Sequence, residues 1–236
     1  MTTTFEGVLA RLAGVEGWLT DAQARRLWDA ASVLPAASRV VEIGSFQGRS
    51  TIVLASAAAE GVEVVAIDPH AGNDRGPQEI AGFEAEAADD NRRFEANLAA
   101  AGVRERVRHV RRFSNEALDE VDGEVDLLYI DGAHRYGPAR DDIVRWGARV
   151  RHGGTLLIHD SFSSIGVTLA ILTTLLTSRS WTYVGRSGSM TEYRRTPPGS
   201  VVANAAAQAA SLPWFAWNVV LKVLIAAKVL RRPWPY

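Results

Sequence analysis

The sequence has no cysteine among its 236 residues. Disulfide frameworks, thiolate metal sites and cysteine nucleophiles are therefore excluded. It also lacks a strong charge of either sign, because the formal net charge is -1, and we expect no binding to nucleic acid. The first residues lack the basic start, apolar core and small-residue cleavage site of a signal peptide, so we expect a cytoplasmic protein.

The residues that are present favour an α/β domain. Short β-branched runs alternate with helical patterns, which predicts a Rossmann-like, doubly wound sheet of seven strands, mostly parallel, with a C-terminal antiparallel hairpin strand. The expected strands are residues 39–43, 62–67, 107–110, 125–130, 155–158, 181–184 and 190–193. The expected helices are residues 22–34, 50–59, 89–101, 140–150 and 167–176, with a short helix capped by Ser114.

The chain divides into a domain and a tail. Residues 1–195 form the predicted domain, with an N-terminal helical cap over about residues 1–36. Residues 196–236 are a linker followed by an apolar, Trp-rich C-terminal helix. Within the domain, residues 70–82 are polar and have no clear period, which predicts a loop or lid. His70, Asn73, Asp74 and Arg75 could meet a substrate there, although a solvated loop is the favoured interpretation for each of them alone.

A glycine turn follows the first expected strand. Gly44 and Gly48 lack the Cβ that would keep a ligand away from the backbone, and open α/β sheets bind ligands at the carboxyl ends of their strands. Asp68 ends the next strand, where its carboxylate can accept two hydrogen bonds from a ribose diol. These residues predict a nucleoside-bearing cofactor, although the glycines alone also fit a plain strand-to-helix turn.

The same turn discriminates between cofactors. A dinucleotide fold uses G-x-G-x-x-G to hold a pyrophosphate, whereas Gly44 and Gly48 form G-x-x-x-G with Glu42 just before them. A buried acid beside the turn repels a pyrophosphate and suits the cationic aminoacyl sulfonium of S-adenosylmethionine (SAM). The turn therefore favours SAM over a nicotinamide cofactor.

With these motifs the chain resembles the class I SAM-dependent methyltransferases of the small-molecule and sugar O-methyltransferase type. The resemblance covers about residues 18–195 and is carried by residues 17–20, 41–51, 129–136, 153–154 and 159–160. It implies that Glu42, Gly44, Ser45 and Ser50 line the aminoacyl end of SAM and that Asp68 holds the ribose. It also implies that Ser114, and with it Asn115, lies at the adenine. We further count Gly48 and Asp131 among the residues that contact SAM.

Three chemically active side chains follow neighbouring strands. Asp131 and His134 have the spacing D-x-x-H after one strand, and Asp160 follows the next. A hydroxyl acceptor needs a base, or a metal that lowers its pKa, before it attacks the methyl carbon. We predict His134 as the catalytic base and Asp131 and Asp160 as ligands of Mg²⁺ or another divalent cation.

The third protein ligand is open. His159 is one candidate, and it suits Zn²⁺ or Mn²⁺ better than Mg²⁺. Ser161 is another, because related catechol enzymes carry an amide at that position. A bland alternative is that Asp160 caps the next helix and that His134 bonds to the backbone near SAM.

The tail carries its own alternatives. Residues 213–230 are apolar and Trp-rich, with Lys222 and Lys228 inside the run, which makes them a poor membrane-spanning segment. The tail could pack on the domain or on a second copy as a homo-oligomer. That packing is the favoured interpretation, and the alternative is that the tail lies on the inner face of a membrane.

The leading hypothesis is metal-assisted, SAM-dependent O-methylation of a hydroxyl on a sugar or glycosylated small molecule. One alternative is a non-catalytic SAM- or glycan-binding partner that the tail tethers to a membrane assembly. A weaker alternative is a nicotinamide-dependent oxidoreductase.

Overall fold

The computed structural model describes residues 4–71 and 84–229. Its seven strands form one sheet in the order β3-β2-β1-β4-β5-β7-β6. The strands are β1 (Arg39–Ile43), β2 (Glu63–Ile67), β3 (Val107–Val110), β4 (Val125–Ile130), β5 (Val150–Ile158), β6 (Thr182–Ser187) and β7 (Met190–Arg194). β3, β2, β1, β4 and β5 are parallel, whereas β7 is antiparallel to both β5 and β6. The predicted α/β fold with its antiparallel C-terminal hairpin is confirmed.

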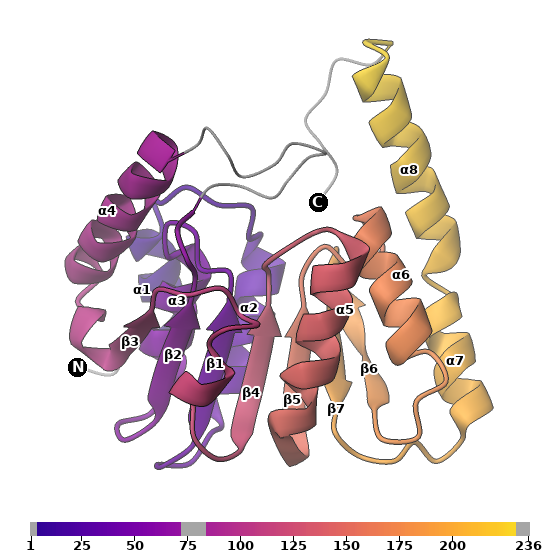
Figure 1. Ribbon diagram of the computed structural model, residues 1–236, viewed down its shortest axis with the longest axis horizontal. Helices are drawn as coiled ribbons and strands as arrows, with labels where there is room; N and C mark the ends of the chain where they lie inside the picture. The colour runs from indigo at the N-terminus through magenta and orange to yellow at the C-terminus, as the bar shows by residue number, and fades with distance from the viewer. Residues whose placement is uncertain (1–3, 72–83, 230–236) are drawn as a thin grey trace.

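Helices cover both faces of this sheet (Figure 1). They are α1 (Phe5–Arg11), α2 (Asp21–Ser32), α3 (Arg49–Ala57), α4 (Glu84–Ala100), α5 (Tyr136–Arg145), α6 (Ile165–Thr174), α7 (Val201–Ala209) and α8 (Leu212–Ala226). Buried residues of α1 to α4 share one core cluster, and those of α5 and α6 share the other. The central strands are buried on both sides, which explains their continuous apolar sequences.

The order of the strands creates a ligand site. The chain goes from β1 outward to β2 and β3, then returns to β4 and β5 on the other side of β1. The helices that follow β1 and β4 therefore lie on opposite faces, and a crevice opens between the carboxyl ends of these two strands. Both predicted site motifs, the glycine turn after β1 and D-x-x-H after β4, flank this crevice.

Several boundaries differ from those expected. The helix expected from residue 140 begins at Tyr136, and the expected helix after Ser114 is a turn followed by a short 3-10 helix, Leu118–Glu120. β5 begins at Val150 rather than at residue 155, because a register shift against β4 accommodates the Gly153-Gly154 pair within the strand. Gly153 has a φ of +77°, which other residues rarely adopt.

The tail begins with a helix that the sequence did not indicate. α7 follows the expected linker, and two of its amides bond to the domain. Asn204 Oδ1 accepts from the Tyr183 backbone N–H at 2.8 Å, and its Nδ2 donates to the Trp181 carbonyl at 3.1 Å. Gln208 donates to the Leu175 carbonyl and accepts from the Tyr193 hydroxyl. α7 is therefore fastened to the sheet, and α8 continues past it.

Candidate functional site

The glycine turn brings the ends of β1 and β4 into contact. Gly44 has a φ of +85°, and a Cβ built on it would lie 2.3 Å from the carbonyl oxygen of Asp131. Gly48, with a φ of +89°, is the N-cap of α3, and its Cβ would lie 2.5 Å from Leu98 Cδ1. Gly44 is required by both conformation and space, because its neighbour is backbone, whereas Gly48 is favoured by its positive φ.

Asp68 fastens this turn from β2. One carboxylate oxygen accepts from the backbone N–H groups of Ser45 at 2.8 Å and Phe46 at 2.9 Å, and the other accepts from the His70 N–H at 2.8 Å. The carboxylate has about four lone-pair positions, so it retains capacity for one further donor. Asp68 thus shapes the loop and also faces the cavity described next.

A cavity of about 490 Å³ lies above the carboxyl ends of β1, β2 and β4. This volume is within the usual range of small-molecule sites, roughly 300–1,000 Å³. The predicted site residues that line it are Gly44, Asp68, Ser114, Asn115, Asp131 and His134. Phe46, His70 and Asp142 line it as well. Asn73, Asp74 and Arg75, named as possible substrate contacts, lie outside the described residues.

The other predicted cofactor residues lie behind the wall of the cavity. Glu42 is fully buried, and its carboxyl group receives hydrogen bonds from the hydroxyls of Ser50 and Thr51. Burial raises the pKa of Glu42 to about 8, so the neutral form predominates at pH 7. Glu42 therefore anchors the start of α3. The sequence argument for SAM over a pyrophosphate relied on a negative charge on Glu42, and that charge is largely absent at pH 7.

Ser45 and Gly48 are also buried in this wall. The Ser45 Oγ atom is buried without a hydrogen-bond partner, although the Ser45 backbone binds Asp68. An unsatisfied hydroxyl of this kind is costly unless a ligand or water engages it. Its position beside the turn is consistent with a bound polar group at this end of the cavity.

Ser114 is held by a residue that the sequence analysis did not single out. Its hydroxyl donates to Asp142 Oδ1 at 2.5 Å, and its carbonyl accepts from the indole N–H of Trp146 at 3.1 Å. Burial raises the pKa of Asp142 to about 6. Asp142 sits on α5, so this helix fixes the far end of the cavity, where the resemblance places adenine.

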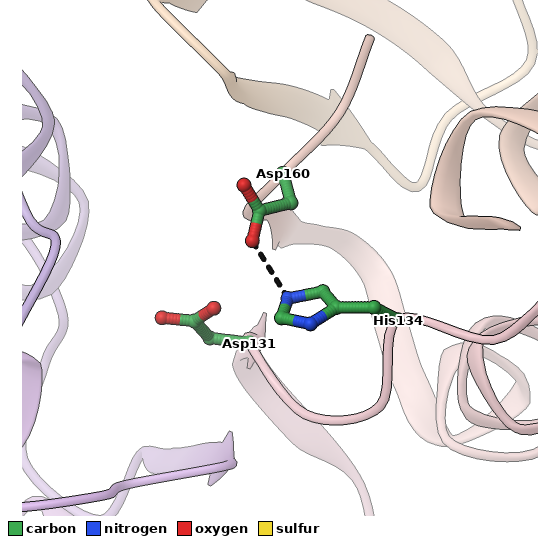
Figure 2. Close-up of side chains that lie close together, drawn as sticks. All are labelled: Asp131, His134 and Asp160. Carbon is green, nitrogen blue, oxygen red and sulfur yellow. Dashed lines mark ion pairs between the residues drawn. The ribbon is translucent and has the colours of Figure 1, made fainter. Parts of the chain in front are cut away.

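His134 and Asp160 form an ion pair at the other end. His134 Nε2 lies 2.7 Å from Asp160 Oδ2 (Figure 2). The loop between β4 and α5 carries His134, and Asp160 follows β5 with a left-handed φ of +53°. This geometry does not support a role for Asp160 as a helix cap, because Ser164 is the N-cap of α6 and Asp160 contributes only its carbonyl to Ser163 and Ser164.

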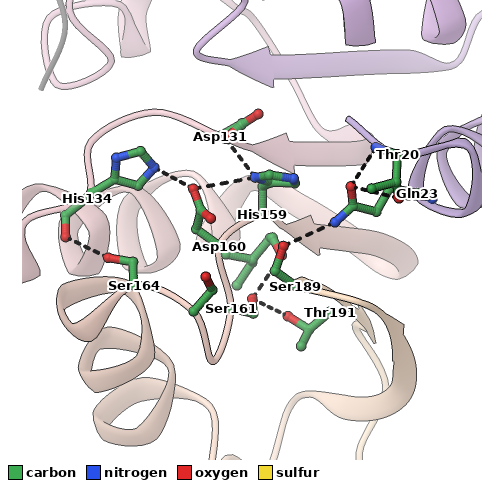
Figure 3. A network of polar contacts seen from close by, with 12 residues as sticks. Thr20, Gln23, Asp131, His134, His159, Asp160, Ser161, Ser164, Ser189 and Thr191 are labelled. Carbon is green, nitrogen blue, oxygen red and sulfur yellow. Dashed lines mark hydrogen bonds and ion pairs between the residues drawn. The ribbon is translucent and has the colours of Figure 1, made fainter. Parts of the chain in front are cut away.

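His159 lies beside both carboxylates, with a contact to each (Figure 3). Its Nδ1 is 3.2 Å from Asp131 Oδ1 and 3.5 Å from Asp160 Oδ2. Burial alone would lower the pKa of His159, but the two carboxylates outweigh it and raise the pKa to about 10. Burial would likewise raise the pKa of Asp160, yet its contacts with His134 and His159 hold it well below its usual range. The site thus balances two carboxylates with a buried imidazolium.

The donor set suits a divalent cation. One ligand atom from each of Asp131, His134 and Asp160 lies within 4.8 Å of the others, and carboxylate oxygens and imidazole nitrogen are common metal ligands. His134 therefore joins the two acids more readily than the residues expected as third ligand. His159 cannot coordinate while protonated. The Ser161 hydroxyl is buried and engaged by the Ile158 carbonyl and by Thr191.

The C-terminal helix reaches the loop that carries Asp160. Asn218 Nδ2 donates to the Phe162 carbonyl at 3.3 Å, and Lys222 Nζ donates to the Ser163 carbonyl at 2.9 Å and to its hydroxyl at 3.1 Å. Phe162, like Asp160, has a positive φ. α8 thus supports an unusual backbone conformation beside the site, and no local pattern in the sequence announced this contact.

The comparisons with known sequences agree with the geometry. Residues 41–161, just over half of the chain, match the family model of a methyltransferase domain. Over 130 residues the chain is 31% identical to an uncharacterized protein, y4gI, of Sinorhizobium fredii, and the match covers 52% of this chain and 13% of that protein. The chain therefore spans only a small part of the length of this relative.

Solved structures share the fold. The chain is similar to the O-methyltransferase TomG of Streptomyces achromogenes, involved in tomaymycin synthesis and solved with SAM, with a TM-score of 0.55, 18% identity, and 81% and 89% of the two chains covered. It is also similar to a Bacillus cereus O-methyltransferase solved with S-adenosylhomocysteine, with a TM-score of 0.54, 18% identity, and 80% and 90% coverage. From the family match and the fold we conclude that the chain belongs to the class I SAM-dependent methyltransferases.

Proposed function

We propose that the protein transfers a methyl group from SAM to a hydroxyl group of a small molecule. The observation that carries this proposal is that His134, which contacts Asp160, lines the same cavity as Gly44 of the glycine turn. A base and a nucleoside-sized site then share one chamber. The structural neighbours described above are themselves named as O-methyltransferases, which supports oxygen as the acceptor atom.

The residues allow a simple division of labour in this step. In the neutral tautomer of His134 with the proton on Nε2, that nitrogen faces Asp160 at 2.7 Å and Nδ1 is the nitrogen that can accept a proton. The acceptor hydroxyl gives its proton to that nitrogen while its oxygen forms a bond to the methyl carbon. The carbon–sulfur bond breaks with its electron pair on sulfur, and the products are a methyl ether and S-adenosylhomocysteine. Asp160 stabilises the imidazolium that forms.

SAM fits the other end of the cavity on three observations. Gly44 leaves the end of β1 bare of a side chain, Asp68 keeps a lone-pair position for a ribose hydroxyl, and the Ser45 hydroxyl has no partner of its own. We place the aminoacyl end near Gly44 and the adenine near Ser114 and Asn115. Glu42, Gly48 and Ser50 shape this seat from behind rather than through contact.

A divalent cation, Mg²⁺ first, belongs to the proposal. Asp131 and Asp160 would hold it, with His134 or a deprotonated His159 as the third protein ligand. When bound, the cation would lower the pKa of the acceptor hydroxyl. His134 Nε2 cannot both bind a metal and keep its proton. The acceptor hydroxyl is therefore activated either by the metal or by His134 acting as a base beside Asp160.

We extend the acceptor to a sugar or a glycosylated small molecule on the motif resemblance alone. The non-catalytic binding role is the second candidate, and it is disfavoured because Asp131 and His134 line one cavity while Asp160 contacts His134. Family membership leaves no support for a nicotinamide-dependent oxidoreductase. The cytoplasmic location stays a prediction.

The deciding experiment replaces His134 with alanine. Release of S-adenosylhomocysteine is measured over a panel of sugar and phenolic hydroxyl acceptors, with SAM affinity measured by calorimetry. We expect turnover to fall about 10²–10⁴-fold, the usual contribution of a general base, and SAM affinity to change little. His152→Ala, at an exposed position of β5, is the matched control. A fully active His134→Ala protein would remove His134 from the mechanism.

Chelation separates the two versions of activation. If a cation is required, EDTA abolishes turnover and added Mg²⁺ restores it, while SAM binding persists in EDTA. If EDTA does not change turnover but His134→Ala abolishes it, His134 acts as the base and no metal is required. If neither the wild type nor His152→Ala binds SAM, the assignment of the cavity as a SAM site is contradicted.

A further inference from the structure

The outer face of α8 is apolar where a surface helix is normally polar. The exposed side chains within this helix are Leu212, Pro213, Ala216, Trp217, Val220 and Val223. Trp217 is 57% exposed and Val223 is 60% exposed. The polar side chains Asn218 and Lys222 point inward to the loop beside Asp160. This is the reverse of the amphipathic pattern expected for a helix in water, so the outer face is suited to an apolar partner.

Charge identifies the kind of partner. Six of the 26 basic residues and none of the 27 acidic residues lie in residues 193–236. The remaining 192 residues therefore carry 20 basic and 27 acidic residues. Four of the basic residues, Lys222, Lys228, Arg231 and Arg232, lie on α8 or directly after it. The segment that carries the apolar face thus contains basic residues and no acidic ones, which matches a partner surface that is both apolar and anionic.

The dimensions of α8 exclude a bilayer span. The stretch Val201–Ile225 is apolar and long enough to cross a membrane by composition, but α7 is fastened to the sheet by Asn204 and Gln208. α8 alone has 15 residues, or about 22 Å of helix, whereas the hydrocarbon core is roughly 30 Å thick. Its inner face is engaged by the domain, so it can offer only its outer face.

We propose that α8 docks the enzyme on the surface of an anionic lipid bilayer, with Trp217, Val220 and Val223 in the interfacial layer. Trp217, exposed on the outer face, is of the residue type that concentrates at membrane interfaces. Lys228 is exposed after α8, and with Arg231 and Arg232 of the following sequence it supplies positive charge for anionic headgroups. A second copy is the weaker partner, because a two-fold contact through this face would bring together two segments that carry positive charge and no acidic residue. Figure 1 shows α8 rising beyond the edge where the parallel strands end, which is the edge of the cavity.

Flotation with vesicles tests the docking directly. Full-length protein is mixed with vesicles of phosphatidylcholine and phosphatidylglycerol, or of phosphatidylcholine alone, and is centrifuged through a density gradient. We expect flotation with the anionic vesicles and much less with the neutral ones. Val223→Glu should abolish it, whereas Val33→Glu, which adds the same charge at an exposed apolar position after α2, should float like the wild type. A melting curve for each variant checks that it is folded.

A second variant tests the charge independently of the apolar face. Replacing Lys228, Arg231 and Arg232 together with glutamine should weaken vesicle binding by about fivefold per residue removed. Flotation needs no methyl transfer, so it can succeed or fail independently of the proposed function. Unchanged flotation of both variants, or flotation equal on neutral and anionic vesicles, overturns the proposal. A wild-type dimer in lipid-free buffer that Val223→Glu converts to a monomer, with no flotation of either, assigns the face to a second copy instead.

Discussion

At the scale of single residues, Glu42 has a structural role that its sequence context concealed. It is an acid beside a ligand-binding turn, yet it is buried, bonded to two hydroxyls of α3 and excluded from the cavity. Its neutral form is the stable one inside the protein, because burial disfavours the charge. Glu42 therefore links pH to stability rather than to contact with the cofactor.

Replacing Glu42 with glutamine tests this role. The folded pKa of about 8 lies above the ordinary value of 4.5, so the folded state holds the proton that the unfolded chain releases. Glu42 thus contributes stability that is complete below pH 4.5 and is lost as pH rises to about 8, by at most about 1.4 kcal/mol per pH unit. Denaturant melts should show Glu42→Gln gaining on the wild type across this window. A constant difference between the two proteins from pH 5 to pH 8 would contradict the neutral buried acid.

Which residues could be predicted depends on how local their signal is. Gly44, Asp68, Asp131 and His134 follow strands directly, and parallel strands bring their carboxyl ends to one edge. Asp142 and Gly166 are different. Asp142 meets Ser114 only because α5 packs over the cavity, and a Cβ on Gly166 would lie 2.2 Å from the His134 carbonyl. Such roles arise from packing between distant segments, which a single sequence does not display.

At the scale of elements, α8 contacts the loop that carries Asp160. Lys222 binds both the carbonyl and the hydroxyl of Ser163, three residues after Asp160. The loop between them contains two residues with positive φ, Asp160 and Phe162, and such conformations persist only when their surroundings hold them. α8 is therefore a positioning element for Asp160.

A lysine variant measures this support. In Lys222→Met the Ser163 carbonyl loses a donor, and we expect a stability loss of about 1–3 kcal/mol. We also expect kcat to fall several-fold while the affinity for SAM stays unchanged, because the glycine turn is not touched. Lys228→Met, at an exposed position after α8, is the control. Equal losses of kcat and of SAM affinity would mean that the whole domain has loosened instead.

The elements themselves were largely predictable, with errors where tertiary contacts override local pattern. Buried parallel strands are indicated by continuous β-branched runs. The helix expected over residues 22–34 is also present, and Thr20 caps it with its side chain and Gln23 bonded reciprocally. α7 was missed because its alanine-rich sequence has no strong periodicity. Two of its amide side chains hydrogen-bond to β6 and to the loop after α6. Contacts between such distant segments cannot be predicted from local sequence.

At the scale of the whole molecule, α7 belongs with the sheet rather than with the tail. Its amides satisfy the backbone at Trp181, Tyr183 and Leu175. A domain that ended at residue 195, as expected, would leave these backbone groups without their hydrogen-bond partners. A domain that ended after Ser211 would retain those hydrogen bonds. The mostly parallel sheet could be predicted from the alternation of strand and helix patterns, but the contact between α7 and the sheet could not.

Two truncated chains compare these boundaries. A protein ending at Arg195 should melt below one ending at Ser211, since losing the partners of buried groups costs about 1–3 kcal/mol each. For a chain of this size that corresponds to a difference in Tm of roughly 5 °C or more. Scanning calorimetry of both proteins against the full chain measures it. Identical melting temperatures of the two truncated proteins would mean that α7 does not stabilise the domain.

The uneven distribution of charge along the chain also has a consequence for how the molecule travels. An acidic body that ends in a basic helix has an electric dipole moment, and a dipole rotates in a field before it makes any contact. Close to an anionic surface, within about the 8 Å Debye length at physiological salt, the positive end is drawn forward and the body is pushed back. The orientation of arrival is then set by long-range forces, and the approach slows as salt is added.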